Sequence, residues 1–278
     1  MADPARVRRI VEGAQAASGL PVTVKCRIGV DDRDSYAELH DFVGQVAEAW
    51  GGEGCGGVFI VHARKALLDG LSPAENRSVP ALRRGWAFAL ARDFPHLSFV
   101  LNGEASGSAE AARLLESEAG GARMAGVMIG RAAYQTPWHA LADTDRRLFP
   151  DAENPCANRR DLLIKYAEWC DGVLEEARRG SMPYGRPAVS RMAMPLNGLL
   201  YNEPGASLWR RALHDRRAHC ATMGELVDGL LASCSSRQAE VLDAPPPRDW
   251  LGGSTGGDFD LRLDDVPDGS PAAAAASA

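Results

Sequence analysis

The sequence predicts an α/β fold in which parallel strands alternate with helices, followed by a small helical domain. Four short runs are β-branched and apolar on both faces, as is typical of buried parallel strands; they are residues 22–24, 57–61, 98–101 and 126–129. Amphipathic segments accompany them at 4–17, 36–49, 81–93, 108–117 and 138–148. The first can begin after Asp3 as N-cap, with Pro4 in the first helical position. The repeated alternation indicates parallel βα units.

The pattern changes in the second half of the chain, where strand-like runs are missing. Helical patterns occupy about 158–179, 187–201, 205–219 and 222–234, separated by turn residues. The last residues are rich in Pro, Gly and Ala and carry eight acidic against two basic side chains. We therefore expect an α/β domain over 1–149, a helical domain over 150–237 and a disordered acidic tail over 238–278.

Length and composition fit a globular protein. The chain has 278 residues, of which 45% are hydrophobic and 24% charged. Its apolar runs are too short to span a membrane, and the first residues lack the pattern of a secretory signal. The six cysteines form no CxxC pair and no cluster with zinc spacing. We expect free thiols, no metal and no membrane contact, in a soluble protein of the cytoplasm or an organelle.

The net charge of −6 says little about partners. The acidic tail from 238 onward accounts for all of it, so residues 1–237 are neutral overall. A low isoelectric point that arises in a tail is weak evidence against a nucleic-acid partner.

Polar residues stand at the end of each predicted strand, where a parallel barrel carries its active site. In chain order they are Lys25 and Arg27, then His62, Arg64 and Lys65, then Asn102 and Gly103, then Gly130 and Arg131. Glycine lets backbone N–H groups approach a phosphate closely, so the last two pairs predict a phosphate cradle. Lys25 and His62 are suited to stabilising negative charge on a flavin ring.

Each of these residues also has a structural explanation. A lysine at a strand end is usually solvated, a histidine there is usually a satisfied rim group, and Asn-Gly is usually a turn. The functional interpretation depends on the joint pattern at four equivalent positions.

The same positions lie in blocks of sequence that match a known pattern. The blocks are residues 22–29 (VTVKCRIG), 59–66 (FIVHARKA), 70–77 (GLSPAENR), 101–103 (LNG), 126–137 (GVMIGRAAYQTP) and 204–213 (PGASLWRRAL). Together they resemble motifs of the tRNA-dihydrouridine synthases of the DusA type. The resemblance extends over about residues 1–235.

This resemblance implies the C-terminal half of a (β/α)₈ TIM barrel, followed by a small helical tRNA-binding domain. The implied activity is FMN-dependent reduction of uridine to dihydrouridine in tRNA, with NADPH as the reductant. The implied FMN ligands are Lys25, His62, Asn102, Gly103, Gly130 and Arg131. The implied tRNA contacts are Arg64, Lys65 and Arg77, with Arg186, Arg191, Arg210 and Arg211 as phosphate ligands of the helical domain. A solvated helix face is the alternative for those last four.

The sequence also departs from the family pattern. The family's catalytic cysteine, which protonates the uracil carbon, belongs to the first half of the barrel, and we expect it to be missing here. Cys26 is on the wrong strand for that role, so we expect it to pack in the core. Glu104 replaces the second glycine of an NGG motif, which should weaken binding of the FMN phosphate.

Three interpretations follow. The chain belongs to a tRNA-dihydrouridine synthase, as a truncated product or the product of a misassigned gene boundary that is inactive alone, or it is a non-catalytic RNA-binding remnant of one. A third is another flavin barrel enzyme such as a dihydroorotate dehydrogenase, which the ENR and WRR blocks disfavour. A half barrel should also leave sheet edges, and the inward faces of Val24, Phe59 and Val100 or of their neighbours, without partners. We therefore expect residues 1–149 to aggregate or to pair with another half barrel.

Overall fold

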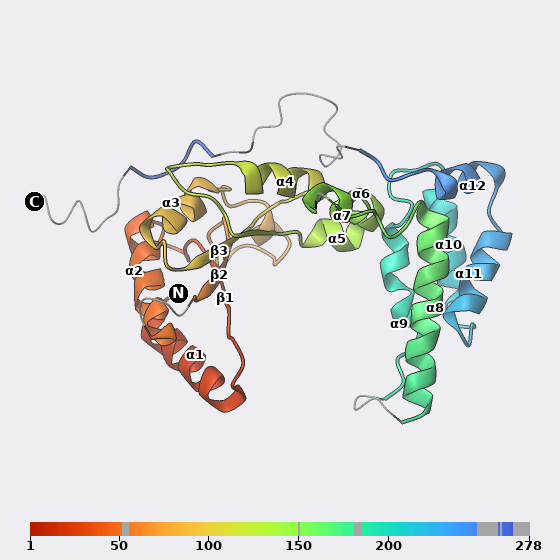
Figure 1. Ribbon diagram of the computed structural model, residues 1–278, viewed down its shortest axis with the longest axis horizontal. Helices are drawn as coiled ribbons and strands as arrows, with labels where there is room; N and C mark the ends of the chain where they lie inside the picture. The colour runs from red at the N-terminus through yellow and green to blue at the C-terminus, as the bar shows by residue number, and fades with distance from the viewer. Residues whose placement is uncertain (52–55, 150, 181–184, 249–260, 262, 269–278) are drawn as a thin grey trace, which may run out of the picture. The chain divides into compact units, whose positions relative to one another are not determined.

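The computed structural model describes residues 1–51, 56–149, 151–180, 185–248, 261 and 263–268 (Figure 1). They form two compact units, each described by itself. Unit 1 comprises residues 1–105, 110–129 and those of 254–278 that are described; unit 2 comprises 106–109 and 130–253. The predicted boundary after residue 149 thus lies later than the structural one after residue 129. The reason is that Trp138, 2% exposed, belongs to the core of unit 2.

Unit 1 contains a parallel sheet, which confirms the predicted α/β class. In its described part the strand order is β1-β2-β3-β4, with β1 Val24–Arg27, β2 Val58–His62, β3 Ser98–Asn102 and β4 Gly126–Met128. The helical segments are α1 Pro4–Ser18, α2 Tyr36–Ala47, η1 Glu48–Trp50, η2 Glu75–Arg77, α3 Gly85–Asp93 and α4 Ser108–Glu116, which unit 1 holds from Glu110 onward. Strand β1 begins two residues later than predicted, so Lys25 and Arg27 lie within it. Its ladder with β2 runs on to the pair Arg27 and His62.

Local sequence fixes the first two helices. Asp3 Oδ1 accepts a hydrogen bond from the amide of Arg6 at 2.9 Å, as predicted for the N-cap of α1. Ser35 and Glu38 form a reciprocal capping box at the start of α2.

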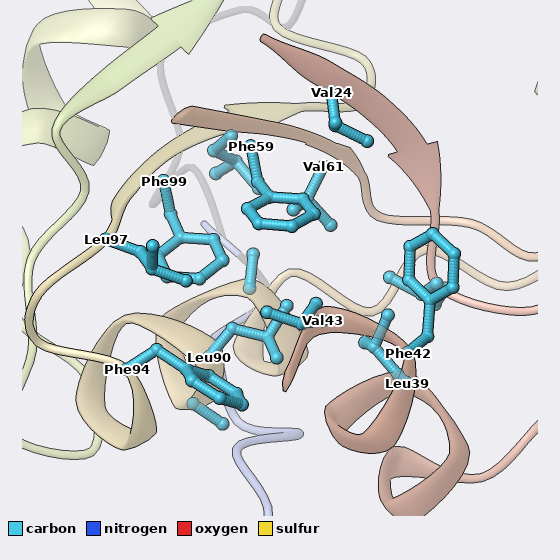
Figure 2. Packing of buried hydrophobic residues seen from close by; sticks show 14 of the residues in the cluster. Val24, Leu39, Phe42, Val43, Phe59, Val61, Leu90, Phe94, Leu97 and Phe99 are labelled. Atoms are coloured by element: carbon cyan, nitrogen blue, oxygen red, sulfur yellow. The ribbon is translucent and has the colours of Figure 1, made fainter. Parts of the chain in front are cut away.

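One face of the sheet packs against helices, as Figure 2 shows. Phe59, Val61 and Phe99 point toward Val43 of α2 and Leu90 of α3, and all five side chains are at most 1% exposed. Alternation places the other strand residues on the opposite face. That second, less buried face carries Lys25, Arg27, Ile60, His62, Val100 and Asn102.

Of the three residues named for an unpartnered face, Val24 and Phe59 are in fact covered by helices. Register pairs Val24 with Phe59, and Phe59 with Phe99, on the face that the helices cover. Val100 lies on the opposite face. The predicted strands are apolar on both faces, so the sequence pattern did not show which face the helices would cover.

Unit 2 is helical in its described part. Its segments are α5 Arg131–Gln135, α6 Pro137–Leu141, α7 Thr144–Leu148, α8 Arg159–Arg178, α9 Val189–Met192, η3 Met194–Gly198, α10 Ala206–Arg216, α11 Met223–Ala232 and α12 Ser236–Asp243. Trp209, Leu163 and Leu226 are at most 1% exposed in its core. Arg159, 2% exposed, donates to the carbonyl oxygens of Leu199 and Val241 at 3.0 Å. It also donates to Glu203 at 2.6 Å.

The predicted disordered tail differs from the structure in two places. Residues 236–243 form α12, which begins with a capping box between Ser235 and Gln238. Leu261 and residues 263–268 contact the rest of unit 1 through hydrogen bonds to Arg84, Gly85 and Arg92. The rest of the predicted tail (residues 249–260, 262 and 269–278) lies outside the described residues.

Candidate functional site

The carboxyl ends of the four strands bring the predicted polar residues of unit 1 into one row. Register places Arg27 beside His62, His62 beside Asn102, and Asn102 beside Met128. Lys25 lies two residues before Arg27 on the same face of β1, and its Nζ donates to Asn102 Oδ1 at 3.0 Å. Asn102 Nδ2 in turn donates to the carbonyl oxygen of Met128 at 3.1 Å. Lys25, His62 and Asn102 are thus gathered at one edge, as the sequence predicted.

The row is positively charged at its β1 end. Partial burial lowers the pKa of Lys25 below its ordinary value. Burial, then the neighbouring charges of Arg64 and Arg77, lower the pKa of Arg27. Because these cations repel one another, the region favours an anion.

Arg27 also holds the loop after β2 in place. Its Nη1 donates to the carbonyl oxygens of Lys65 at 2.8 Å and Asn76 at 2.7 Å. The Asn76 side chain closes the loop by accepting from the Leu67 amide at 2.8 Å and donating to its carbonyl oxygen at 2.6 Å. The ENR block therefore has a structural role in Asn76 that the sequence did not reveal. Arg77, next in the chain, is exposed.

Two of the predicted RNA-contacting residues have carboxylate partners within unit 1. Lys65 Nζ lies 2.9 Å from Asp34 Oδ2, and Asp34 also binds Arg83 at 2.8 Å. Arg64 Nη2 lies 2.6 Å from Glu104 Oε1, and the Arg64 side chain is 5% exposed. Arg64 also donates to the carbonyl oxygen of Pro80. Its burial and pairing favour a supporting role within unit 1. The expected contact of Arg64 with tRNA stays a prediction.

The loop after β3 requires glycine at position 103. Gly103 has a φ of +138°, and a Cβ there would lie 2.9 Å from Leu82 Cδ1. Glu104 follows with a φ of +55°, a left-handed backbone conformation that is uncommon for residues other than glycine. Its pairing with Arg64 offsets the negative charge that was expected to oppose a phosphate. The residues present therefore fit a phosphate-bearing cofactor: a close-approach glycine lies beside Lys25, His62 and Asn102.

The other predicted phosphate loop belongs to unit 2. Gly130 lies two residues after the last residue of β4 and precedes α5, whose first residue is Arg131. Both residues are exposed, and a Cβ at Gly130 would meet nothing within 4 Å. Gly130 is therefore not required by packing.

All four predicted phosphate-binding arginines of unit 2 are exposed. Arg186 donates to the Ala221 carbonyl oxygen at 3.2 Å. Arg211 lines a cavity of about 530 Å³ together with Arg216 and Trp209. Arg216 was not predicted. Trp209 of the WRR block instead has a core role, since its Nε1 donates to the Leu196 carbonyl oxygen at 2.8 Å.

Burial of two charged side chains near the row was also missed. Arg84 is 2% exposed and Glu110 is fully buried, and they pair at 2.6 Å. Arg84 also donates to the carbonyl oxygen of Gly103 at 3.0 Å. No sequence motif marks these residues, because their pairing joins the start of α3 to α4.

Cys26 packs against the hydrophobic core of unit 1. Burial raises its pKa to about 12. It alternates with Lys25 and Arg27 along β1, so it belongs to the opposite face from the row. Across the described ranges, side chains of His, Cys, Asp and Glu form no cluster of three that could hold a metal. Helices in these ranges are too short or too polar to cross a membrane.

Comparison with known proteins identifies relatives over most of the chain. The family model for dihydrouridine synthase (Dus) matches residues 1–233. The tRNA-dihydrouridine(20/20a) synthase of Vibrio cholerae is 38% identical over 242 residues, which are 87% of this chain and 67% of that protein. The protein of the same name from Pseudomonas putida is 48% identical over 198 residues, 71% of this chain and 54% of the relative. The chain thus spans roughly three fifths of the length of such relatives.

Proposed function

Because this chain belongs to the dihydrouridine synthase family, we propose that it provides flavin-binding strand ends and a tRNA-binding helical unit for the reduction of uridine to dihydrouridine in tRNA. The relatives' names specify positions 20 and 20a of tRNA as their target, and we extend that target to this chain. The observation that carries the proposal is the row in which Lys25, His62 and Asn102 meet at the carboxyl ends of neighbouring parallel strands.

We assign FMN as the cofactor and NADPH as its reductant. FMN, once reduced, supplies the hydride that the uracil ring accepts. Lys25 and His62 stabilise negative charge near the flavin ring, and Asn102 orients Lys25 through their 3.0 Å hydrogen bond. Gly103 accommodates the phosphate within unit 1. Gly130 and Arg131 belong to unit 2, and their part in binding FMN stays a prediction from the family resemblance. The four strands are assigned to the C-terminal half of a (β/α)₈ barrel, whose interior is lined by the Lys25, Ile60 and Val100 face.

We assign tRNA contacts to the exposed arginines, namely Arg77, Arg186, Arg191, Arg210 and Arg211. Arg64 is reassigned to a supporting role, since Glu104 and Pro80 engage its guanidinium. Cys26 receives no catalytic role, because its raised pKa and core packing suit neither proton donation nor access to a base.

Flavin titration tests the cofactor assignment. We expect the full chain to quench FMN fluorescence on binding, and Lys25→Met to weaken that binding about tenfold or more, since a hydrogen bond to a charged group contributes about 1.5–3 kcal/mol. Lys165→Met, at an exposed lysine of α8, is the matched control. Equal affinities in all three proteins would refute the assignment of the row.

A second experiment tests the activity. Residues 1–233 of this chain replace the matching segment of the Pseudomonas putida relative, and dihydrouridine is measured in tRNA from cells that lack their own synthase. We expect dihydrouridine at positions 20 and 20a, and its loss when Lys25→Met is introduced. Binding of tRNA without any flavin binding or dihydrouridine would favour the alternative of a non-catalytic RNA-binding protein.

A further inference from the structure

The C-terminal part of the chain returns to unit 1 and lies against helix α3 (Figure 1). Three hydrogen bonds hold Leu261 and residues 263–268, which we call the clasp. Asp265 Oδ1 accepts from the amide of Gly85 at 2.7 Å. Arg92 Nη1 donates to the carbonyl oxygen of Pro267 at 2.9 Å, and Arg84 Nη1 to that of Leu261 at 3.2 Å. The clasp thereby satisfies the first amide of α3, whose N-cap residue, Arg84, makes no side-chain capping bond.

Unit 1 is shaped to receive this segment. Leu261, Leu263 and Val266 pack against its hydrophobic core. A Cβ on Gly85 would lie 2.5 Å from both Asp265 Oδ1 and the Val266 amide nitrogen. A Cβ on Gly120 would lie 2.7 Å from Val266 Cγ1. The missing side chains of these two glycines therefore leave the space that the clasp fills, so the clasp packs closely against unit 1.

Arg84 connects the clasp to the loop after β3. The same guanidinium that binds the Leu261 carbonyl oxygen donates through Nη2 to the Gly103 carbonyl oxygen at 3.0 Å and to Glu110 at 2.6 Å. Arg84 is 2% exposed, so its guanidinium cannot hydrogen-bond to bulk water. The clasp supplies one of the acceptors that this buried cation requires. Release of the clasp would free one donor of Arg84 and expose Gly85 and Gly120 to solvent.

We propose that the clasp is an intramolecular ligand of unit 1, and that its docking on α3 fixes the Gly103 loop through Arg84. The binding surface takes an extended acidic and apolar peptide, with a carboxylate for the α3 N-terminus and a branched apolar side chain against Gly120. The consequence for cofactor affinity rests on the proposed function, since it takes Gly103 to be a phosphate-contacting residue. The docking itself does not.

Four variants of the full chain test the docking. Val266→Asp places a charge against the hydrophobic core of unit 1, and Asp265→Ala removes the acceptor for the Gly85 amide. Asp265→Asn keeps that acceptor, and Asp264→Ala, at the exposed neighbour, is the matched control. Hydrogen–deuterium exchange is followed by mass spectrometry in peptides that cover residues 84–94 and 98–106.

We expect Val266→Asp and Asp265→Ala to accelerate exchange at least tenfold in both peptides, while Asp265→Asn and Asp264→Ala stay within about twofold of the parent chain. Unchanged exchange in residues 84–94 with Val266→Asp would overturn the docking. Faster exchange in 84–94 without any change in 98–106 would overturn the connection through Arg84.

FMN titration of the same variants separates this proposal from the proposed function. Val266→Asp should weaken FMN binding at least threefold, and Asp264→Ala should leave it unchanged. If the parent chain binds no FMN, the proposed function fails while the exchange data still decide the docking. If FMN binds equally well to all variants despite faster exchange in 98–106, the fixed Gly103 loop has no role in the site, and that part of the inference is wrong.

Discussion

Replacing Glu104 with Gly should lower the stability of unit 1 and at the same time tighten its binding of FMN. Glu104 has a φ of +55°, so a glycine would relieve backbone strain. Its carboxylate, however, lies 2.6 Å from Arg64, whose side chain is only 5% exposed. The substitution therefore removes the charged partner of a buried cation that cannot return to water.

The change in stability depends on whether the relief of backbone strain or the loss of the ion pair is larger. Left-handed backbone strain in a non-glycine residue costs about 1–2 kcal/mol, and part of that gain is offset because glycine adds freedom to the unfolded chain. Breaking a fully buried ion pair from one side costs about 3–5 kcal/mol. The Glu104 side chain is 33% exposed, so we take the low end of that range. The net loss of stability is about 1–2 kcal/mol.

The effect on FMN has the opposite sign. Removal of Glu104 leaves the Arg64 charge uncompensated by that carboxylate, and the change of one unit charge near a phosphate contributes about 0.5–1 kcal/mol in a water-like medium. FMN binding should tighten about two- to fivefold. The double variant Arg64→Met with Glu104→Gly removes both charges, so its FMN affinity should return to within about twofold of the parent chain.

Urea denaturation and FMN titration form a double-mutant cycle. They are applied to the parent chain, to Glu104→Gly, to Arg64→Met and to the double variant. Reduced ionic strength should enlarge the difference in FMN affinity, because the effect is electrostatic. A Glu104→Gly chain that is more stable than the parent would show that strain outweighs the ion pair. Unchanged or weaker FMN binding would refute the assignment of the Gly103 loop to the phosphate.

Three further substitutions test the two cores and the buried thiol. Phe59→Ala should destabilise unit 1 by about 3–5 kcal/mol, since its ring is fully buried between Trp50 and Phe99; a loss below about 1 kcal/mol in urea denaturation would contradict this packing. Arg159→Met should destabilise unit 2 by about 2–4 kcal/mol, because Glu203, which is partly exposed, loses its 2.6 Å partner and two carbonyl oxygens lose their donor; thermal melting of the variant against the exposed control Arg210→Met measures it. The raised Cys26 pKa of about 12 means that the unfolded chain ionises this thiol first, so stability should fall as the pH rises from about 9 toward 12. Cys26→Ala should flatten that pH dependence, and an identical pH profile in the two proteins would contradict burial of the thiol.

The strands were predictable because buried parallel strands have a distinctive sequence. Three of the four begin and end within one residue of the apolar runs, and the predicted row of strand ends forms in unit 1. Strand β1 is the exception, since its ladder includes Lys25 and Arg27. Charged residues fit inside a strand when alternation directs them to the less buried face, which an apolar run does not reveal.

Features that depend on contacts distant in sequence could not be predicted. Arg64 and Arg84 look like surface arginines in the sequence, yet both are buried because Glu104 and Glu110 reach them from other segments. The docking of Leu261 depends on the same Arg84. The acidic composition of the tail gave no sign of helix α12 or of a binding surface on α3.

The charges near the row are compatible with the proposed binding of an anionic cofactor to an acidic chain. Carboxylates partner two of the cations, Lys65 with Asp34 and Arg64 with Glu104. Arg27, by contrast, donates its hydrogen bonds to carbonyl oxygens, which carry no full charge. Its pKa is lowered by burial and by the charges of Arg64 and Arg77. An anion bound nearby would reverse that lowering and relieve the repulsion among these guanidinium groups. The local field at the strand ends therefore favours a phosphate, whereas the net charge of −6 resides in the tail beyond residue 237.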